Sequence, residues 1–206
     1  LQALYGRNGE SPVPVVASSS PGDCFFTAIE AARIALEHMT PVMLLSDGFL
    51  ANGAEPWAIP DTATLPRINV SHHTDPDGFH PYARNPETLA RPWAVPGTPG
   101  LEHRLGGLEK ADVTGHVSYD PANHEAMSRI RAEKVERIAR NIPDVEIDGD
   151  PTGDLLIVGW GGTYGALRGA TKALRESGRS VSHVHLRHLN PLPSNLGEVL
   201  EGFRHV

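Results

Sequence analysis

In two stretches of the chain, apolar runs and turn residues follow one another in the pattern of a strand, a helix and a second strand. In the first stretch, valines within 13–16 lie among prolines and serines and predict a short strand near a sheet edge, where proline removes no ladder bond. Apolar residues then recur at helical spacing from Phe25 up to His38. The unbroken apolar run at 42–45 is typical of a strand buried on both faces of a parallel sheet.

The second stretch repeats this order more clearly. An apolar run at 155–158 predicts a buried strand, and Gly161 and Gly162 follow as a tight turn. Apolar positions over 166–174 form one face of a helix, and residues 181–186 form the returning strand. The fold class is therefore predicted to be α/β, with two parallel-sheet lobes.

Each lobe supplies only about two strands, fewer than a covered parallel sheet needs, so we expect both lobes to be incomplete. Residues 190–193 turn the chain, and Ser194 or Asn195 is expected to cap a last helix that leads toward a further strand. The chain starts at Leu1 rather than at methionine. We therefore expect both ends to be cut.

Residues 53–121 differ from both units, because they carry ten of the eighteen prolines. Long regular elements cannot form there, but the tryptophans and other aromatic residues of this segment are uncommon in disordered tracts, so we expect an ordered meander. An exposed helix is predicted next, over 121–141. It carries a thin apolar stripe and three i,i+4 pairs, Glu125 with Arg129, Glu133 with Arg137, and Glu136 with Arg140.

The amino-acid composition excludes several classes of protein and of function. A content of 39% hydrophobic and 21% charged residues is that of a globular protein, and neither a signal peptide nor an apolar run of membrane-spanning length is present. The net charge of −7 disfavours binding to nucleic acid. The single cysteine, Cys24, excludes an internal disulfide and an all-cysteine cluster within this chain, which favours the cytoplasm.

Two turns are candidates for binding chemistry. The glycine-rich stretch at 159–165 follows a strand and opens a helix, so its amides could cradle phosphate, although it lacks the usual dinucleotide spacing and no acidic residue ends the returning strand. The alternative is a turn that lets helix and strand approach closely. Asp47 and Gly48 follow a parallel strand at its carboxyl end, where open α/β sheets place ligands, but a simple turn is equally consistent.

The histidines and the cysteine can be explained without a catalytic or metal-binding role. Two histidine groups could contribute metal ligands, but neither has a helical ligand frame, so we expect no metal site. Cys24 lies at a predicted helix start, where a lowered thiol pKa and simple packing are the alternatives. The two groups are His72, His73 and Asp75, and His183, His185 and His188.

Several motifs together resemble a known family. The motifs at 5–10, 21–25 and 40–49 are similar to the pyrimidine-binding domain of 2-oxoacid:ferredoxin oxidoreductase alpha subunits. The stretches 155–165 and 183–193, which end in Asn190-Pro191-Leu192-Pro193, resemble that subunit's transketolase C-terminal-like domain, in the 2-oxoglutarate type.

The resemblance implies a division of the chain and a set of site residues. Residues 1–60 would be the last part of the pyrimidine-binding domain, 61–150 the meander and connecting helix, and 151–206 a truncated transketolase C-terminal-like domain. Catalytic residues are expected upstream of Leu1. The candidates for lining the cofactor or subunit cleft are Arg7, Asn8, Glu10, Asp47 and Gly48.

The implied activity is oxidative decarboxylation of a 2-oxoacid, 2-oxoglutarate by type, to the acyl-coenzyme A, with electrons passing to ferredoxin. Thiamine diphosphate would stabilise the carbanion. A partner beta subunit would hold most of the diphosphate, its Mg²⁺ and a [4Fe-4S] cluster, so the chain alone is expected to be inactive. The alternatives are a nucleotide-binding module that uses residues 159–165 and a non-catalytic assembly domain.

Overall fold

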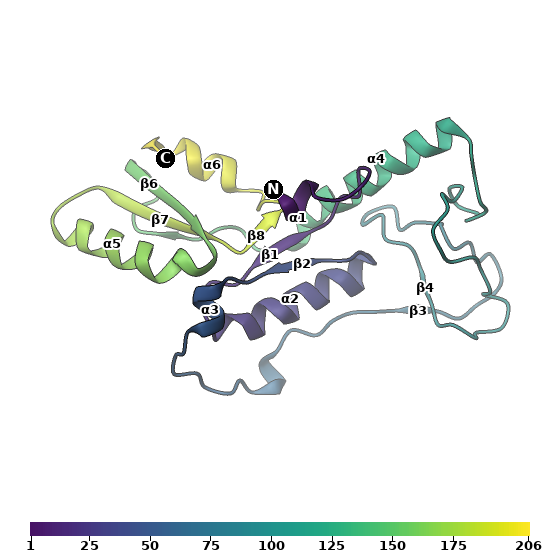
Figure 1. The fold of residues 1–206 in the computed structure, drawn as a ribbon, viewed down its shortest axis with the longest axis horizontal. Coiled ribbons are helices and arrows are strands. Elements are labelled where there is room, and N and C mark those ends of the chain that lie inside the picture. Colours follow the sequence, from purple (N-terminus) through teal and green to yellow (C-terminus); the bar gives the residue numbers. More distant parts are fainter.

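Two mixed sheets carry the fold, and each contains one of the predicted strand, helix, strand units (Figure 1). The computed structural model describes residues 1–206. The first sheet has the order β2-β1-β8. Strand β1 (Val15–Ala17) is parallel to β2 (Met43–Leu45) and antiparallel to β8 (His188–Asn190). The α/β prediction is thus confirmed, and the antiparallel strand β8 in this sheet was not expected.

Helix α2 (Asp23–His38) connects β1 to β2, as the apolar spacing predicted. The Asp23 carboxylate fixes its first turn, because Oδ2 accepts hydrogen bonds from the Ser19 N–H and the Thr27 hydroxyl. Met39 ends the helix in a left-handed conformation with φ 45°. Ile34, at 0% exposure, packs with Val16 in the core of this lobe.

The predicted positions of the two strands in the sheet were wrong. β1 is the central strand rather than an edge strand, and its prolines precede the paired residues, so they cost no bond within the ladder. β2 lies at one edge of the sheet, and Met43 and Leu44 are each 38% exposed. The expected burial of this strand on both faces is therefore wrong for the chain by itself, since no residue of β2 is buried.

The second sheet has the order β5-β7-β6-β9. Its parallel centre is formed by β6 (Gly153–Trp160) and β7 (Val181–Leu186), with α5 (Tyr164–Glu176) between them in sequence. β5 (Ile147–Asp148) adds antiparallel to β7, and β9 (Phe203–His205) adds parallel to β6. The further strand expected after the last helix is therefore β9.

Helices α5 and α6 (Leu196–Glu201) cover opposite faces of this sheet (Figure 1). Leu156 and Val184 pack with Leu196 and Phe203 on the α6 face. The expected side-chain cap of α6 is absent, because the Asn195 side chain bonds instead to the backbone N–H and carbonyl of Val145.

The proline-rich segment is an ordered meander with little regular structure. The short helix α3 (Gly48–Asn52) precedes it, and its own elements are the 3-10 turn η1 (Thr62–Thr64) and the paired strands β3 (His72–His73) and β4 (Trp93–Ala94). The Trp93 indole N–H donates to the Leu36 carbonyl at 2.7 Å, which fastens the meander to α2. A short helix, α1 (Gln2–Tyr5), precedes β1.

Helix α4 (Pro121–Arg137) and the 3-10 turn η2 (Ile138–Asn141) follow the meander, as predicted. Two of the three expected ion pairs form, Glu125 with Arg129 and Glu133 with Arg137. The third does not, since the helix tightens into η2 between Glu136 and Arg140.

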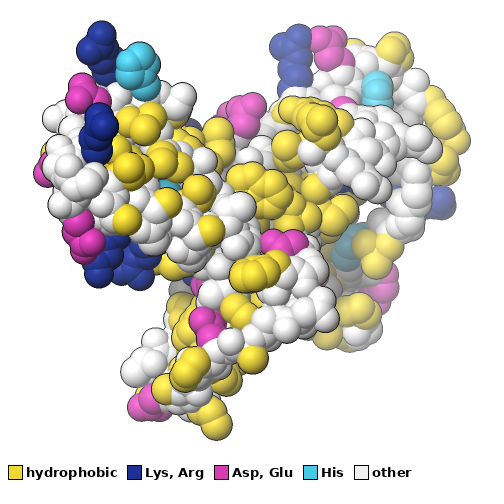
Figure 2. Space-filling view, turned by 60° about the vertical axis from the view of Figure 1, so that its left-hand side comes forward, with side chains coloured by type: hydrophobic (Ala, Val, Ile, Leu, Met, Phe, Trp, Pro, Cys, Tyr) yellow, Lys and Arg dark blue, Asp and Glu magenta, His cyan; other side chains and the backbone are white.

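Apolar side chains remain exposed on the first lobe, and Figure 2 shows hydrophobic surface gathered on the face that it presents. No helix is both long enough and apolar enough to cross a membrane. The exposed apolar residues include Phe25, Phe26, Met43, Leu44 and Phe49.

Candidate functional site

A cleft of about 560 Å³ lies between the two lobes, where β1, β2 and β6 reach their carboxyl ends. The segments that follow β2 and β6 face each other across it. Open α/β sheets bind ligands at this end of their strands. The lining consists of Ser18, Leu45, Ser46, Asp47, Val158, Gly159, Trp160, Gly161, Gly162, Thr163 and Leu167.

Asp47 connects the two lobes at this cleft. Its Oδ1 accepts the Leu50 N–H at 2.9 Å and caps α3, while Oδ2 accepts the Gly162 N–H at 3.0 Å. These backbone hydrogen bonds lower the pKa of the carboxyl below its usual value. The two turns that the sequence singled out separately therefore form one contact.

The glycines of the second turn have close neighbours. A Cβ on Gly162 would lie 2.5 Å from Asp47 Oδ2, and one on Gly159 would lie 2.2 Å from Leu167 Cδ1 in α5. The interpretation as a turn of close approach is confirmed. The Gly162 amide that a phosphate would need already donates to a carboxylate, which disfavours the nucleotide-binding alternative.

Ser18 is a cleft residue that sequence reasoning missed. It follows β1 directly, it is 0% exposed, and its hydroxyl oxygen has no hydrogen-bond partner in the chain. The rule that drew attention to Asp47, a polar side chain after a parallel strand, applies equally to Ser18.

Arg7, Asn8 and Glu10 belong to the loop between α1 and β1 (Figure 1), whereas Asp47 and Gly48 follow β2, so the two groups lie at opposite ends of the parallel strands. Arg7 donates to the carbonyl oxygens of Ala3, Leu4 and Ser11 and so holds its own loop. Glu10 is ion-paired with Arg131 of α4. The structure does not bring the five candidates together, and their role toward a cofactor stays a prediction.

Further polar contacts join α2 to the segment after β7. Arg187 forms an ion pair with Asp23, and His188 Nε2 lies 2.9 Å from Glu30 Oε1. Burial alone would raise the pKa of Glu30, but hydrogen bonds from Arg33 and His188 outweigh it and hold the pKa at about 2. These contacts hold α2 against β8, the antiparallel strand of the first sheet, and against the residue that precedes it.

A second cavity, of about 620 Å³, lies beside the α5 face of the second sheet. His183 and His185 share this face, with ring centroids 5.6 Å apart, and burial lowers the pKa of both. His188, the third member of the predicted group, is instead held by Glu30.

No set of three or more histidine, cysteine or acidic side chains is placed to hold a metal ion. His73 stacks against Phe79 at a centroid distance of 5.2 Å. Cys24 is a free, half-buried thiol in the first turn of α2.

The chain is similar in sequence to several 2-oxoacid oxidoreductases. A family model described as "Pyruvate flavodoxin/ferredoxin oxidoreductase, thiamine diP-bdg" matches residues 1–119. The chain is 57% identical over its whole length to the 2-oxoglutarate oxidoreductase subunit KorA of Mycobacterium tuberculosis, and it covers 31% of that protein. It is 32% identical, over 98% of its length and 32% of the relative, to the 2-oxoacid:ferredoxin oxidoreductase 1 alpha subunit of Aeropyrum pernix.

A solved structure has the same fold. The 2-oxoglutarate:ferredoxin oxidoreductase from Magnetococcus marinus, described with 2-oxoglutarate, coenzyme A and succinyl-CoA bound, matches 98% of this chain with a TM-score of 0.88 and 28% identity. The match covers 36% of that chain. The present chain thus spans about a third of the length of the relatives that it matches.

Proposed function

Because this chain belongs to the pyruvate flavodoxin/ferredoxin oxidoreductase family, we propose that it is part of the alpha subunit of a 2-oxoglutarate:ferredoxin oxidoreductase. The resemblance seen in its motifs is confirmed. The proposal rests on the 57% identity to a 2-oxoglutarate oxidoreductase subunit, which extends over the entire chain. The reaction would be oxidative decarboxylation of 2-oxoglutarate to the acyl-coenzyme A, with electrons passed to ferredoxin in the cytoplasm.

The cleft fits only a part of thiamine diphosphate. Ser18 offers a buried hydroxyl without a partner and Asp47 offers a carboxylate, so these two side chains could face the neutral ring of the cofactor. No lysine or arginine lines the cleft to neutralise a diphosphate. When bound, the cofactor would supply an electron sink for the carbanion.

We therefore assign the diphosphate, its Mg²⁺ and the [4Fe-4S] cluster to a beta subunit, as the family resemblance implies. A chain with one cysteine cannot supply the four thiolates of such a cluster. Asp47 and Gly48 remain our candidates for lining the cofactor cleft. The division of the chain at residues 60 and 150 also remains a prediction.

The test compares the complete alpha and beta complex with this chain alone. We expect coenzyme A-dependent reduction of ferredoxin with 2-oxoglutarate, faster than with pyruvate, in the complex and no turnover by the chain. Turnover by the isolated chain would contradict the proposal that this chain supplies only part of the active site. A complex that keeps full activity with Asp47→Ala, yet dissociates when residues 61–100 are deleted, would favour the assembly alternative.

A further inference from the structure

A third cavity, separate from the interlobe cleft, carries a concentration of positive charge. It has a volume of about 430 Å³ and lies between the meander, α4 and the loop before β1. Seven formally charged side chains line it, five of them cationic, so the formal excess is three positive charges. They are Arg84, Arg91, Lys110, Arg131 and Lys134, with Glu10 and Glu109.

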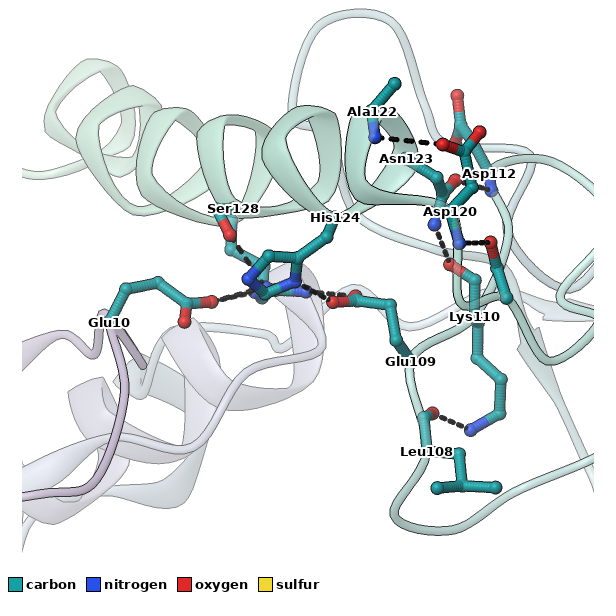
Figure 3. A network of polar contacts seen from close by, with 12 residues as sticks. Glu10, Leu108, Glu109, Lys110, Asp112, Asp120, Ala122, Asn123, His124 and Ser128 are labelled. Carbon is teal, nitrogen blue, oxygen red and sulfur yellow. Dashed lines mark hydrogen bonds and ion pairs between the residues drawn. The ribbon is translucent and has the colours of Figure 1, made fainter.

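The carboxylates of Glu10 and Glu109 both form ion pairs with Arg131. Arg131 is ion-paired with Glu10 and lies 2.9 Å from Glu109, whose second oxygen contacts His124 (Figure 3). The guanidinium of Arg131 and the two carboxylates therefore form a closed group. The other four cations have no acidic partner.

The two lysines are buried against neutral groups. Lys110 is 3% exposed and its ammonium donates to the carbonyl oxygen of Gly106 and to that of Leu108, the second of which Figure 3 shows. Lys134 is 9% exposed and donates to the Met39 carbonyl at 3.0 Å. Burial, together with the nearby arginines, lowers the pKa of Lys134 to about 8, so it is still mostly charged at neutral pH. Buried cations without a counter-charge are costly.

The two remaining arginines have free hydrogen-bonding capacity. Arg91 lies over the Tyr82 ring, 4.5 Å from its centroid, and forms no hydrogen bond or ion pair within the chain. Arg84 donates to the Leu89 carbonyl at 3.0 Å, but its buried Nε has no partner. A planar guanidinium group with unused N–H donors is suited to bind an oxyanion through two parallel hydrogen bonds.

We propose that this cavity binds the phosphate group of a small molecule, a phosphate monoester or a diphosphate. One phosphate monoester carries about −1.5 to −2 charge at neutral pH, so a single ligand would neutralise most of the excess. The whole chain has a net charge of −7, so a cationic cavity does not simply follow from the composition. The site lies outside the interlobe cleft and does not depend on the proposed function.

Calorimetric titration of the chain with pyrophosphate, at fixed ionic strength, tests the proposal. We expect saturable binding near one equivalent, weakened about tenfold or more in the double variant Arg84→Gln, Arg91→Gln. Arg179→Gln is the matched control, because Arg179 is exposed and lies outside the cavity. No binding by the native chain, or equal affinity in both variants, would overturn the proposal, as would succinate binding as tightly as pyrophosphate.

A measurement on the native chain avoids any folding defect of the variant. Phenylglyoxal modifies accessible arginines, and mass spectrometry of peptides locates the product. We expect pyrophosphate to slow modification of Arg91 and to leave Arg179 unchanged. Equal protection of both residues, or of neither, would contradict a site at this cavity. Failure of catalysis in the complete complex would leave these results unaffected.

Discussion

Single residues at the cleft decide how closely the lobes approach each other. Asp47 caps α3 with one carboxylate oxygen and accepts the Gly162 amide with the other. Only a residue without a Cβ leaves room for that contact at position 162. A carboxylate of the first lobe and a glycine of the second are thus matched across the cleft.

We expect Gly162→Ala to break this contact. The new Cβ would lie 2.5 Å from Asp47 Oδ2, so the carboxylate must turn away. Hydrogen exchange at residues 46–50 and 159–164 should accelerate by roughly three- to tenfold, the effect of losing one hydrogen bond. Gly165→Ala is the control, since a Cβ at this position of α5 would have no atom within 4 Å and the exchange rate should not rise. Equal acceleration in the two variants would show that the contact is unimportant.

At the level of elements, the first lobe depends on a small core. Val16 of β1, Ile34 of α2 and Ile138 of η2 are each at 0% exposure and pack together with Ile142. Three elements that are distant in sequence therefore share one set of contacts. Loss of any member leaves a cavity that the short strands cannot close.

Ile34→Ala should lower the free energy of unfolding by about 2–5 kcal/mol, because it removes a fully buried side chain and leaves a cavity. Urea unfolding followed by circular dichroism measures the change. Leu36→Ala lies on the same helix at 38% exposure and should cost less than half as much. If Leu36→Ala lowered the free energy of unfolding more than Ile34→Ala does, the core of this lobe would have to lie on the other side of α2.

Apolar periodicity predicted the helices and strands of both units, since local pattern determines α2, β6, α5 and β7. It could not predict the position of a strand in its sheet. β1 is central because β8, made much later in the chain, pairs with it. The cationic cavity was also missed, because its arginines and lysines are scattered from position 84 to position 134 and only the meander brings them together.

At the scale of the whole molecule, charged contacts join segments that are distant in the sequence. Glu30 of α2 binds Arg33 and also His188, which lies after the second parallel unit. The Glu30 side chain is only 15% exposed. Its ionised form is therefore a link between distant parts of the chain.

Acid should weaken this link. The pKa of Glu30 is about 2 in the folded chain, against an ordinary value of 4.5, so its contribution is complete above pH 4.5 and is lost as the pH falls toward 2. The full contribution is roughly 3 kcal/mol, and more than half should be gone at pH 3. Urea unfolding at pH 3 and pH 6 measures it. Glu30→Gln should reduce the difference between the two pH values, whereas Glu136→Gln, at an exposed position without an ion pair, should not. Identical pH dependence in all three proteins would contradict this role.

The pairing of β1 with β8 has a consequence for biosynthesis. A ribosome makes Val15 and its neighbours long before Asn190, which pairs with Val15. Until then one side of β1 presents unpaired backbone groups, a surface on which nascent chains associate with one another. Completion of the first sheet must therefore wait until residues 188–190 have been made, and the nascent chain depends on protection of that side of β1 until then.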